Sequence, residues 1–247
     1  MIKYERTNGL TDVHTHYCPG CTHGILHKLV AEVLAELGVL GKTVGIASVG
    51  CSVFSYDYFN TDFQQVPHGR ACATATGIKR ILPDRVVFTY QGDGDFGSIG
   101  IAEAIHAANR GENITAIVAN NATYGMTGGQ MAPTTLLGQV STTSQQGRIK
   151  ELHGSPLKMA EIISQITGAA YVERVSLHDV AHIRKAKKAI KKAFTYQLEN
   201  KGFTMIEVVS TCPVNWGMKP RQALDWSRDN MLPVFPLGVY KDVEAND

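Results

Sequence analysis

The chain has 247 residues, of which 44% are hydrophobic, and its 24 basic and 22 acidic residues leave a net charge of +2. This composition supplies one good core, indicates one domain over residues 1–247, and excludes an overall nucleic-acid footprint. The N-terminus lacks an apolar signal core, and no apolar run reaches membrane-spanning length. We therefore expect a cytoplasmic protein, whose five cysteines favour metal binding or reactive thiols over disulfides.

The first cysteines lie in a tight turn that precedes a strong helix. In the C-x-x-C of Cys18 and Cys21, Pro19 and Gly20 allow both sulfurs to face one point. A thioredoxin-type redox pair is one interpretation, but that motif normally follows a strand, and no convincing strand precedes this one. Apolar residues at three- and four-residue spacing then predict a helix from 25 to 37.

A buried strand is predicted over residues 42–49, and it ends at Gly50 and Cys51. A loop leads to His68 and Arg70, and small residues predict a helix over 71–81 that stops before a proline. Cys72 lies among alanines inside this helix. We interpret it as a packed core thiol rather than a metal ligand.

The central stretch, residues 85–130, reads as strand, acidic glycine turn, helix, strand and asparagine turn. Residues 85–91 are rich in β-branched and aromatic side chains, as in buried parallel strands. After the turn at 92–97, an apolar stripe at helical spacing predicts a helix, and a second strand covers 114–119. That strand ends in Asn120 and Asn121.

The acidic turn spells the dinucleotide fingerprint G-x-G-x-x-G with Gly92, Gly94 and Gly97. We reject a dinucleotide site, because Asp93 and Asp95 would repel a pyrophosphate unless a cation lay between them. In addition, the next strand ends in neutral amides, where a nicotinamide site requires an acid. Asp93 and Asn121 instead offer hard oxygen ligands at two strand ends, which predicts a Mg²⁺ that also takes diphosphate oxygens.

The remaining pattern is helix 157–166, strand 170–175, helix 180–200 and strand 203–209, followed by Cys212. Beyond it, prolines favour an extended arm over about 213–247. The alternation of strands and helices predicts an α/β fold, with a parallel sheet covered by helices on both faces.

In such sheets, ligands gather at the carboxyl ends of the strands. Cys51, the Gly92 loop, the Asn121 loop and Cys212 all follow strands, so we expect them along one edge. With the C-x-x-C, four cysteines could reach one centre. Four thiolates suit zinc or an iron-sulfur cluster equally well by softness and count.

At the acidic turn the chain resembles thiamine diphosphate enzymes, whose motif is GDG followed at a set spacing by NN. Here GDG is Gly92 to Gly94 and NN is Asn120 to Asn121, with 25 residues between them. The resemblance implies a thiamine diphosphate-binding fold in which Asp93 and the Asn121 side chain bind Mg²⁺ with the backbone carbonyl of Thr123. The cofactor-binding residues that it implies are Gly92, Asp93, Gly94, Asp95, Asn121, Thr127 and Gly128.

Further motifs make the chain similar to the β-subunit of 2-oxoacid:ferredoxin oxidoreductases. They are YCPGC from Tyr17, GC at Cys51, HGRA from His68, TGGQ from Thr127 and TCP from Thr211. The resemblance covers nearly the whole chain, and it implies that a 4Fe-4S cluster is bound by Cys18, Cys21, Cys51 and Cys212. The chain departs from many members in having Thr22 in place of glycine, and in the additional Cys72. Neither departure removes a ligand.

The family resemblance also implies a reaction: coenzyme A-dependent oxidative decarboxylation of a 2-oxoacid, with electrons passing through the cluster to ferredoxin. The 2-oxoacid could be 2-oxoglutarate, a branched-chain 2-oxoacid or pyruvate, and the products are acyl-CoA and CO₂. The chain has room only for the diphosphate-binding domain, so an α-subunit must supply the pyrimidine-binding domain and its activating glutamate. The family adds γ and ferredoxin-like δ subunits or fusions. His68 and Arg70 are the catalytic candidates, Arg70 for diphosphate or a substrate carboxylate.

Two alternatives differ in class. A non-catalytic zinc-binding scaffold explains four cysteines but not Asp93 with Asn121. A thiamine-dependent decarboxylase or carboligase subunit explains the diphosphate motif but leaves the cysteines without a role.

The predicted helix at 180–200 carries six positive charges between Arg184 and Lys192. We favour a solvated outer face for them over a patch that steers ferredoxin.

Overall fold

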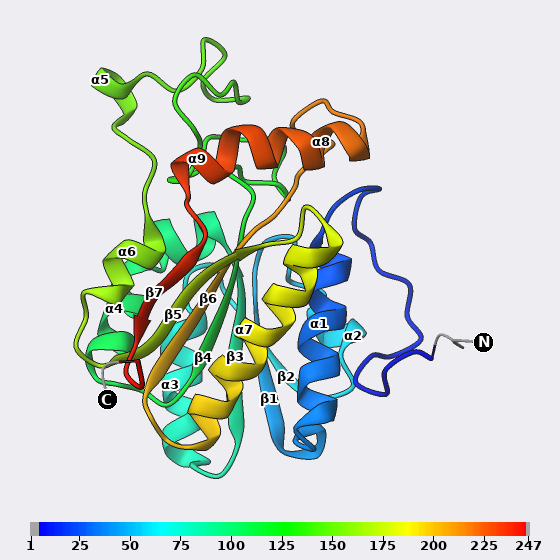
Figure 1. Ribbon diagram of the computed structural model, residues 1–247, viewed down its shortest axis with the longest axis vertical. Coiled ribbons are helices and arrows are strands. Elements are labelled where there is room, and N and C mark those ends of the chain that lie inside the picture. The colour runs from blue at the N-terminus through cyan, green and yellow to red at the C-terminus, as the bar shows by residue number, and fades with distance from the viewer. Residues whose placement is uncertain (1–4, 246–247) are drawn as a thin grey trace.

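The computed structural model describes residues 5–245, and its seven strands form a single sheet (Figure 1). The strand order is β2-β1-β3-β4-β6-β5-β7, and all neighbours are parallel except β5 and β7. The strands are β1 Thr43–Ser48, β2 Asp62–Val66, β3 Val86–Gly92, β4 Thr115–Asn120, β5 Ala169–Ser176, β6 Phe203–Val209 and β7 Gly238–Asp242. The helices are α1 His23–Glu36, α2 Ser55–Tyr58, α3 Ala71–Ile81, α4 Ile101–Asn109, α5 Lys150–His153, α6 Met159–Ser164, α7 Val180–Leu198, α8 Pro220–Trp226 and α9 Leu232–Val234, with single turns η1 Leu40–Lys42, η2 Asp95–Ile99 and η3 Ser227–Met231.

Helices cover both faces of the sheet, which confirms the predicted α/β architecture. Helices α1 and α7 lie side by side on one face (Figure 1), where Phe88 and Tyr90 of β3 join their core. Helices α3, α4 and α6 contribute to the core on the other face, to which Val87 of the same strand belongs. The central strands are therefore buried on both sides, which explains their nearly unbroken apolar sequences.

The expected extended arm beyond residue 213 is wrong. A helical segment runs from Pro220 through η3 to α9, and β7 then adds an antiparallel edge strand beside β5. Pro220 and Pro233 occupy the first turns of α8 and α9, where the missing N–H of proline is tolerated. Met231 and Phe235 of this segment pack in a small core with Ala122. The prolines start helices here rather than preventing them.

Strand β2 was not predicted from the sequence either. This strand is short, lies at the edge of the sheet and has mostly exposed side chains, of the sequence Asp62-Phe-Gln-Gln-Val66. An edge strand pairs through its backbone on one side only, so it needs neither the apolar run nor the alternation that marks the central strands.

An excursion, residues 131–158, projects from the body near the end of the sheet that α8 and α9 cover (Figure 1). One buried side chain, Arg148, holds the two ends of the excursion together, residues 132–135 and 153–155. The guanidinium of Arg148 donates hydrogen bonds of 2.7–3.3 Å to the backbone carbonyls of Ala132, Pro133, Thr135, His153, Gly154 and Ser155. The excursion therefore has an ordered polar interior in place of an apolar core.

The basic face of α7 finds acidic partners within the chain. Lys187 forms ion pairs with Glu32 (2.6 Å) and Glu36 (2.7 Å) of α1, and Lys191 pairs with Glu36 at 3.0 Å. Lys192 pairs with Asp242 of β7. These contacts favour a role in helix packing and solvation over an unpaired steering patch. Across residues 5–245, no helix has both the length and the hydropathy to span a membrane.

Candidate functional site

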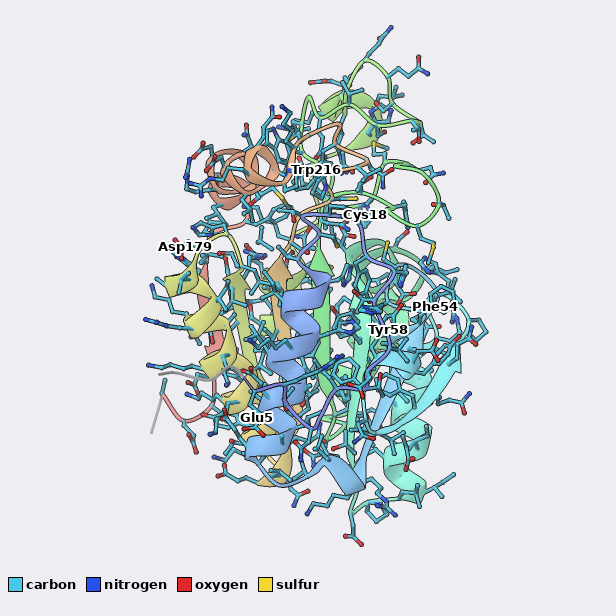
Figure 2. All side chains as sticks on the ribbon, turned by 90° about the vertical axis from the view of Figure 1, so that its right-hand side faces the viewer. Glu5, Cys18, Phe54, Tyr58, Asp179 and Trp216 are labelled. Carbon is cyan, nitrogen blue, oxygen red and sulfur yellow. The ribbon has the colours of Figure 1, made fainter. Side chains whose placement is uncertain are left out.

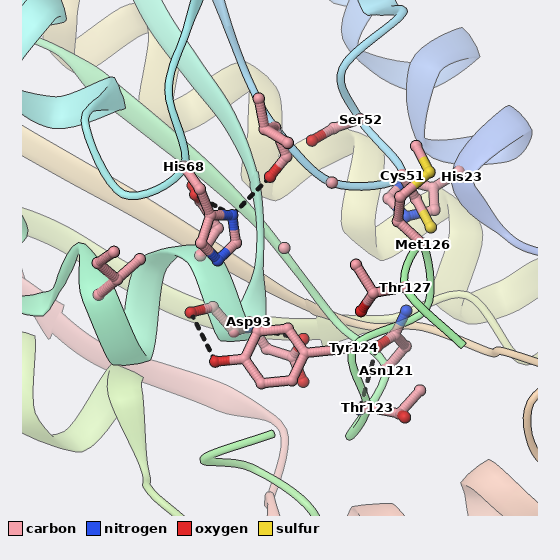
Figure 3. Close-up of a pocket in the computed structure, with 16 residues that line it drawn as sticks. His23, Cys51, Ser52, His68, Asp93, Asn121, Thr123, Tyr124, Met126 and Thr127 are labelled. Atoms are coloured by element: carbon pink, nitrogen blue, oxygen red, sulfur yellow. Dashed lines mark hydrogen bonds and ion pairs between the residues drawn. The ribbon is translucent and has the colours of Figure 1, made fainter. Parts of the chain in front are cut away.

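The carboxyl ends of β1, β3 and β4 lead into one cavity of about 510 Å³ (Figure 3). Its wall brings together most of the residues predicted from the sequence, although they come from four separate loops. The predicted residues lining it are Cys51, His68, Gly92, Asp93, Gly94, Asp95, Asn121, Thr123 and Thr127. Gly128 follows Thr127 but does not line the cavity itself.

Asp93 is a buried carboxylate in this wall. It accepts hydrogen bonds from the backbone N–H of Gly94 (2.9 Å) and from the hydroxyl of Thr134, which belongs to the excursion. Burial nevertheless raises the pKa of Asp93 to about 7, because these two bonds compensate only part of the lost hydration. A divalent cation beside Asp93 would stabilise the ionised carboxylate, so the environment fits a hard metal ligand.

The two asparagines after β4 have different roles. Asn121 lines the cavity, and its side-chain oxygen accepts the backbone N–H of Thr123 at 3.2 Å. Asn120 instead points into the protein, where it donates to the fully buried Glu207 of β6 at 2.7 Å and accepts from the backbone N–H of Ala122. Ala122 has the unusual φ of +56°. Asn120 therefore holds the turn that presents Asn121 and Thr123.

Gly94 is required for close packing between the two loops. A Cβ at this position would lie 2.1 Å from the ring of Tyr124, which follows the asparagine turn. The Tyr124 hydroxyl also reaches the carbonyl of Gly94 at 3.4 Å. Any side chain at Gly94 would therefore separate the loop of Asp93 from the loop of Asn121.

Asp95 serves a different purpose from Asp93. Its oxygens accept hydrogen bonds from the Ser48 hydroxyl (2.7 Å), the Gly69 backbone N–H (2.6 Å) and the Gln91 amide. The Nδ1 atom of His68 lies 3.0 Å from the same carboxylate and 2.6 Å from the carbonyl of Val49. Two acceptors at Nδ1 fix the proton there, and Asp95 raises the pKa of His68. Asp95 thus orients His68, which lines the cavity.

Arg70 does not line the cavity. Its guanidinium forms an ion pair with Glu103 of α4 and donates to the carbonyl of Ile99 at 3.3 Å. The geometry thus supports a role in joining α3 to α4, and it gives no support to the expected contact with diphosphate or substrate.

The C-x-x-C turn lies against the end of β6. Gly20 has a φ of +82°, and a Cβ on it would lie 2.5 Å from Pro220, so the turn depends on glycine twice. Its position is fixed by two hydroxyls. Thr22 contacts Ser210 at 2.5 Å, and Thr211 donates to the carbonyl of Gly20 at 2.8 Å. These bonds bring Cys18 and Cys21 beside the loop of Cys212. In Figure 2, Cys18 and Trp216 are labelled near this end of the sheet.

The other two cysteines, Cys51 and Cys212, both lie close to Gly125. A Cβ on Gly125 would lie 3.1 Å from the Cys51 sulfur and 3.5 Å from the Cys212 sulfur. Burial, together with the negative charge of neighbouring cysteines, raises the pKa of Cys21 to about 11 and that of Cys51 to about 12. Four thiolates therefore require a cationic centre to hold them ionised.

Cys72 is a packed core thiol, as predicted. It is 1% exposed and donates to the side-chain oxygen of Gln91 at 3.4 Å, beneath the Asp95 network.

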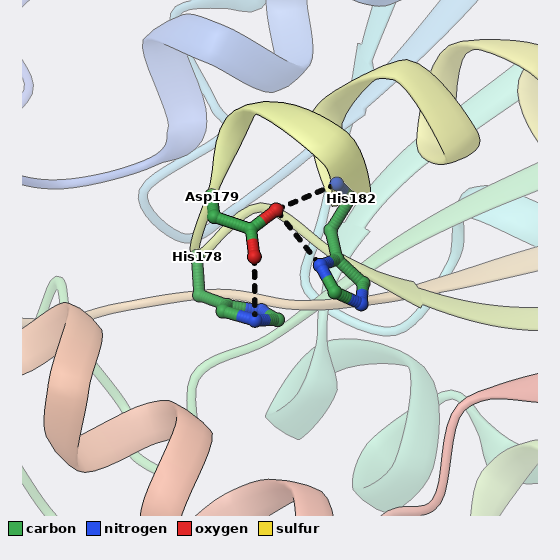
Figure 4. Close-up of side chains that lie close together, drawn as sticks. All are labelled: His178, Asp179 and His182. Atoms are coloured by element: carbon green, nitrogen blue, oxygen red, sulfur yellow. Dashed lines mark hydrogen bonds and ion pairs between the residues drawn. The ribbon is translucent and has the colours of Figure 1, made fainter.

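A separate group of ligand-type side chains lies at the start of α7 (Figure 4): His178, Asp179 and His182. Asp179 is the N-cap, and it accepts from the backbone N–H of His182 at 2.8 Å and contacts the rings of both histidines. Burial is the main cause of the lowered pKa of His178, and the positive charges of His182 and the nearby Arg228 contribute less. Helix capping accounts for this group, and the nearby guanidinium opposes a cation there.

His23, which was not predicted from the sequence, lines the cavity beside Cys51 (Figure 3). Its Nδ1 lies 2.8 Å from the hydroxyl of the buried Tyr90, and burial lowers the pKa of His23 to about 4. The only feature of the sequence that could have indicated a role for His23 in the site is its position directly after Cys21 and Thr22. The partner Tyr90 is far away in sequence.

Comparisons with known proteins agree with this geometry. Residues 48–208 match the family of the thiamine pyrophosphate enzyme C-terminal TPP-binding domain. The chain is 47% identical to ketoisovalerate oxidoreductase subunit VorA of Methanothermobacter thermautotrophicus over 98% of this chain and 51% of that protein. It is 35% identical to 2-oxoglutarate synthase subunit KorB of Methanocaldococcus jannaschii over 99% of this chain and 87% of that protein.

A solved structure is also similar. It is a 2-oxoglutarate:ferredoxin oxidoreductase from Magnetococcus marinus with 2-oxoglutarate, coenzyme A and succinyl-CoA bound, with a TM-score of 0.82 and 26% identity over 98% of this chain and 86% of that one. The chain spans about half the length of the VorA protein but most of the length of KorB. Fold, motifs and relatives together show that the chain belongs to the family of thiamine diphosphate-binding β-subunits of 2-oxoacid:ferredoxin oxidoreductases.

Proposed function

We propose that this chain is the β-subunit of an enzyme that converts a 2-oxoacid and coenzyme A into acyl-CoA and CO₂ and passes the electrons to ferredoxin. One observation carries the proposal. The cavity with Asp93, Asn121 and Thr123 and the group of four cysteines share one edge of the sheet, and Cys51 belongs to both. A decarboxylase without electron transfer requires only the first of these sites.

In the cavity, Asp93, the Asn121 side chain and the Thr123 carbonyl would hold Mg²⁺, which takes the diphosphate oxygens. Thiamine diphosphate, when bound, supplies the carbanion chemistry that cleaves the bond to the carboxylate. The protein contributes position and protons. His68 presents its second ring nitrogen to the cavity, because Asp95 and Val49 occupy the first. Its raised pKa suits it to hold a proton near the reacting atoms.

Cys18, Cys21, Cys51 and Cys212 would hold a 4Fe-4S cluster that accepts electrons from the cavity. Support comes from the gathering of the four cysteines at one edge of the sheet and from thiols that need a cationic centre. A zinc scaffold leaves the Asp93 cavity unexplained.

Among the substrate classes, a branched-chain 2-oxoacid is supported best. The relative named for ketoisovalerate shares 47% identity with this chain, whereas the KorB protein named for 2-oxoglutarate shares 35%. The activating glutamate would come from an α-subunit with the pyrimidine-binding domain, and ferredoxin-like δ and γ subunits or fusions would complete the enzyme.

The test is anaerobic co-expression with the partner subunits, followed by measurement of iron, zinc and thiamine in the purified complex. We expect a brown protein with four irons per chain, which the proposed 4Fe-4S cluster requires, and ferredoxin reduction that depends on ketoisovalerate and coenzyme A. A colourless complex with stoichiometric zinc would refute the proposal. Decarboxylation without ferredoxin reduction in an iron-loaded complex would favour the decarboxylase or carboligase alternative.

A further inference from the structure

Asn215 lies three residues after Cys212, in the turn that follows β6. Its amide nitrogen donates two hydrogen bonds, one to the Cys212 sulfur at 3.2 Å and one to the backbone carbonyl of Gly125 at 2.9 Å. Both partners are acceptors. The reversed amide would place an oxygen against each of them, so these two contacts determine the orientation of the side chain.

The carbonyl partner belongs to the loop that carries the cavity residues. Gly125 follows Asn121 and Thr123 after β4, and it lies close to the sulfurs of both Cys51 and Cys212. Asn215 therefore joins two loops that end different strands. One loop supplies the proposed Mg²⁺ ligands, and the other supplies a proposed cluster ligand.

We propose that Asn215 is a positioning residue that sets the reduction potential of the cluster by donating an N–H to the Cys212 thiolate; this rests on the proposed function. An N–H···S bond draws negative charge from the sulfur, which stabilises the more negative, reduced cluster and raises its potential. The second bond, to Gly125, fixes the amide so that this donor cannot rotate away. Among residues 5–245, no other side chain donates a hydrogen bond to these four sulfurs.

The test compares Asn215→Leu, which keeps the approximate size of the side chain without a donor, with Asn215→Asp, which is isosteric but replaces the N–H by a charged oxygen. In the assembled enzyme, redox titration followed by electron paramagnetic resonance should show a lower midpoint potential for N215L. The potential of N215D should be lower still, because its negative charge opposes reduction. The iron content of both variants should match the wild type.

Asn230→Leu is the matched control. Asn230 is exposed in the same part of the chain and donates only to the carbonyl of Trp226 at 3.1 Å, so the potential should not change. Resonance Raman spectra give a second readout, since loss of the N–H should strengthen one Fe–S(Cys) bond and raise its stretching frequency.

Each remaining result decides between roles. An unchanged potential in iron-loaded N215L would overturn the inference, and loss of iron from both variants would show that Asn215 holds the site together rather than tuning it. A wild-type complex without iron would refute the proposed function itself, which is a different outcome.

Discussion

The two sites at the carboxyl edge are built in different ways. The metal-diphosphate site comes from the loops after two adjacent strands, and its turns are fixed by hydrogen bonds between near neighbours, such as Asp93 to Gly94 and Asn121 to Thr123. The cysteine site comes from segments far apart in the sequence. Long-range contacts such as Thr22 to Ser210 hold it together.

This difference indicates which substitutions should disrupt each site. The metal-diphosphate site depends mainly on bonds within its own loops, with additional support from Thr134 and Glu207. The cysteine site depends on every contact that positions its separate segments. Each site should therefore be removable without the other.

The largest effect should follow Asp93→Ala. Without this carboxylate, Mg²⁺ loses a ligand and no longer holds the diphosphate firmly, so thiamine diphosphate binding should weaken by more than about 100-fold. The measurement is cofactor content and affinity in the assembled enzyme. Iron content should stay at the wild-type level. Wild-type thiamine occupancy in this variant would refute the metal assignment.

Cys212→Ala should have the converse effect. Removing one of four ligands should abolish stable iron binding and ferredoxin reduction while thiamine diphosphate remains bound. Cys72→Ala is the matched control, because this buried thiol bonds only to Gln91 in the core. Equal iron loss in both variants would show that the four ligands are wrongly chosen.

The pH dependence of stability should distinguish the metal-free from the loaded cavity. The pKa of Asp93 is about 7 in the folded chain and near 3.8 when unfolded, so the folded state binds the extra proton between these values. Stability should therefore fall as pH rises from about 4 to 7, by up to about 1.4 kcal/mol per pH unit, and level off above. Urea unfolding of the metal-free protein and of Asp93→Asn across this range isolates the effect. Identical pH profiles would contradict it.

A smaller effect is expected from Thr22→Val, which removes the hydroxyl that contacts Ser210 and accepts from the Thr211 backbone. Leaving those buried groups unpaired should cost about 1–3 kcal/mol of unfolding free energy. It should also lower iron loading, yet leave thiamine diphosphate affinity unchanged. Thr22→Ser keeps the hydroxyl and should behave like the wild type. Loss of cofactor affinity in Thr22→Val would mean that the two sites are not independent.

The smallest effect should follow replacement of Lys187, Lys188 and Lys191 by Gln. Two of these lysines pair with glutamates of α1 at the surface, so unfolding free energy should change by less than about 1 kcal/mol per pair. The rate with ferredoxin and its salt dependence should match the wild type. A lower rate with ferredoxin, but not with an uncharged dye, would restore the steering role.

The same division explains what the sequence could predict. Asp93, Asn121 and the central strands follow from local patterns, and α3 begins and ends where its small residues predict. Thr134, Glu207 and Asn215 support the sites through contacts with residues distant in the chain (Asp93, Asn120 and Gly125), so no local pattern marks them. The C-terminal segment was misjudged because proline starts a helix as readily as it ends one.

The Arg148 contacts imply that the excursion opens as one unit. Residues 132–135 and 153–155 both bond to the same guanidinium. Neither segment can therefore unfold without also releasing the hydrogen bonds of the other. Backbone amides across residues 132–155 should therefore exchange with solvent deuterium together, at one opening free energy. Thr134 stands between two of the bound carbonyls and also donates to Asp93. Each opening event therefore removes one donor from the metal site, and bound cofactor should slow the exchange of the whole excursion.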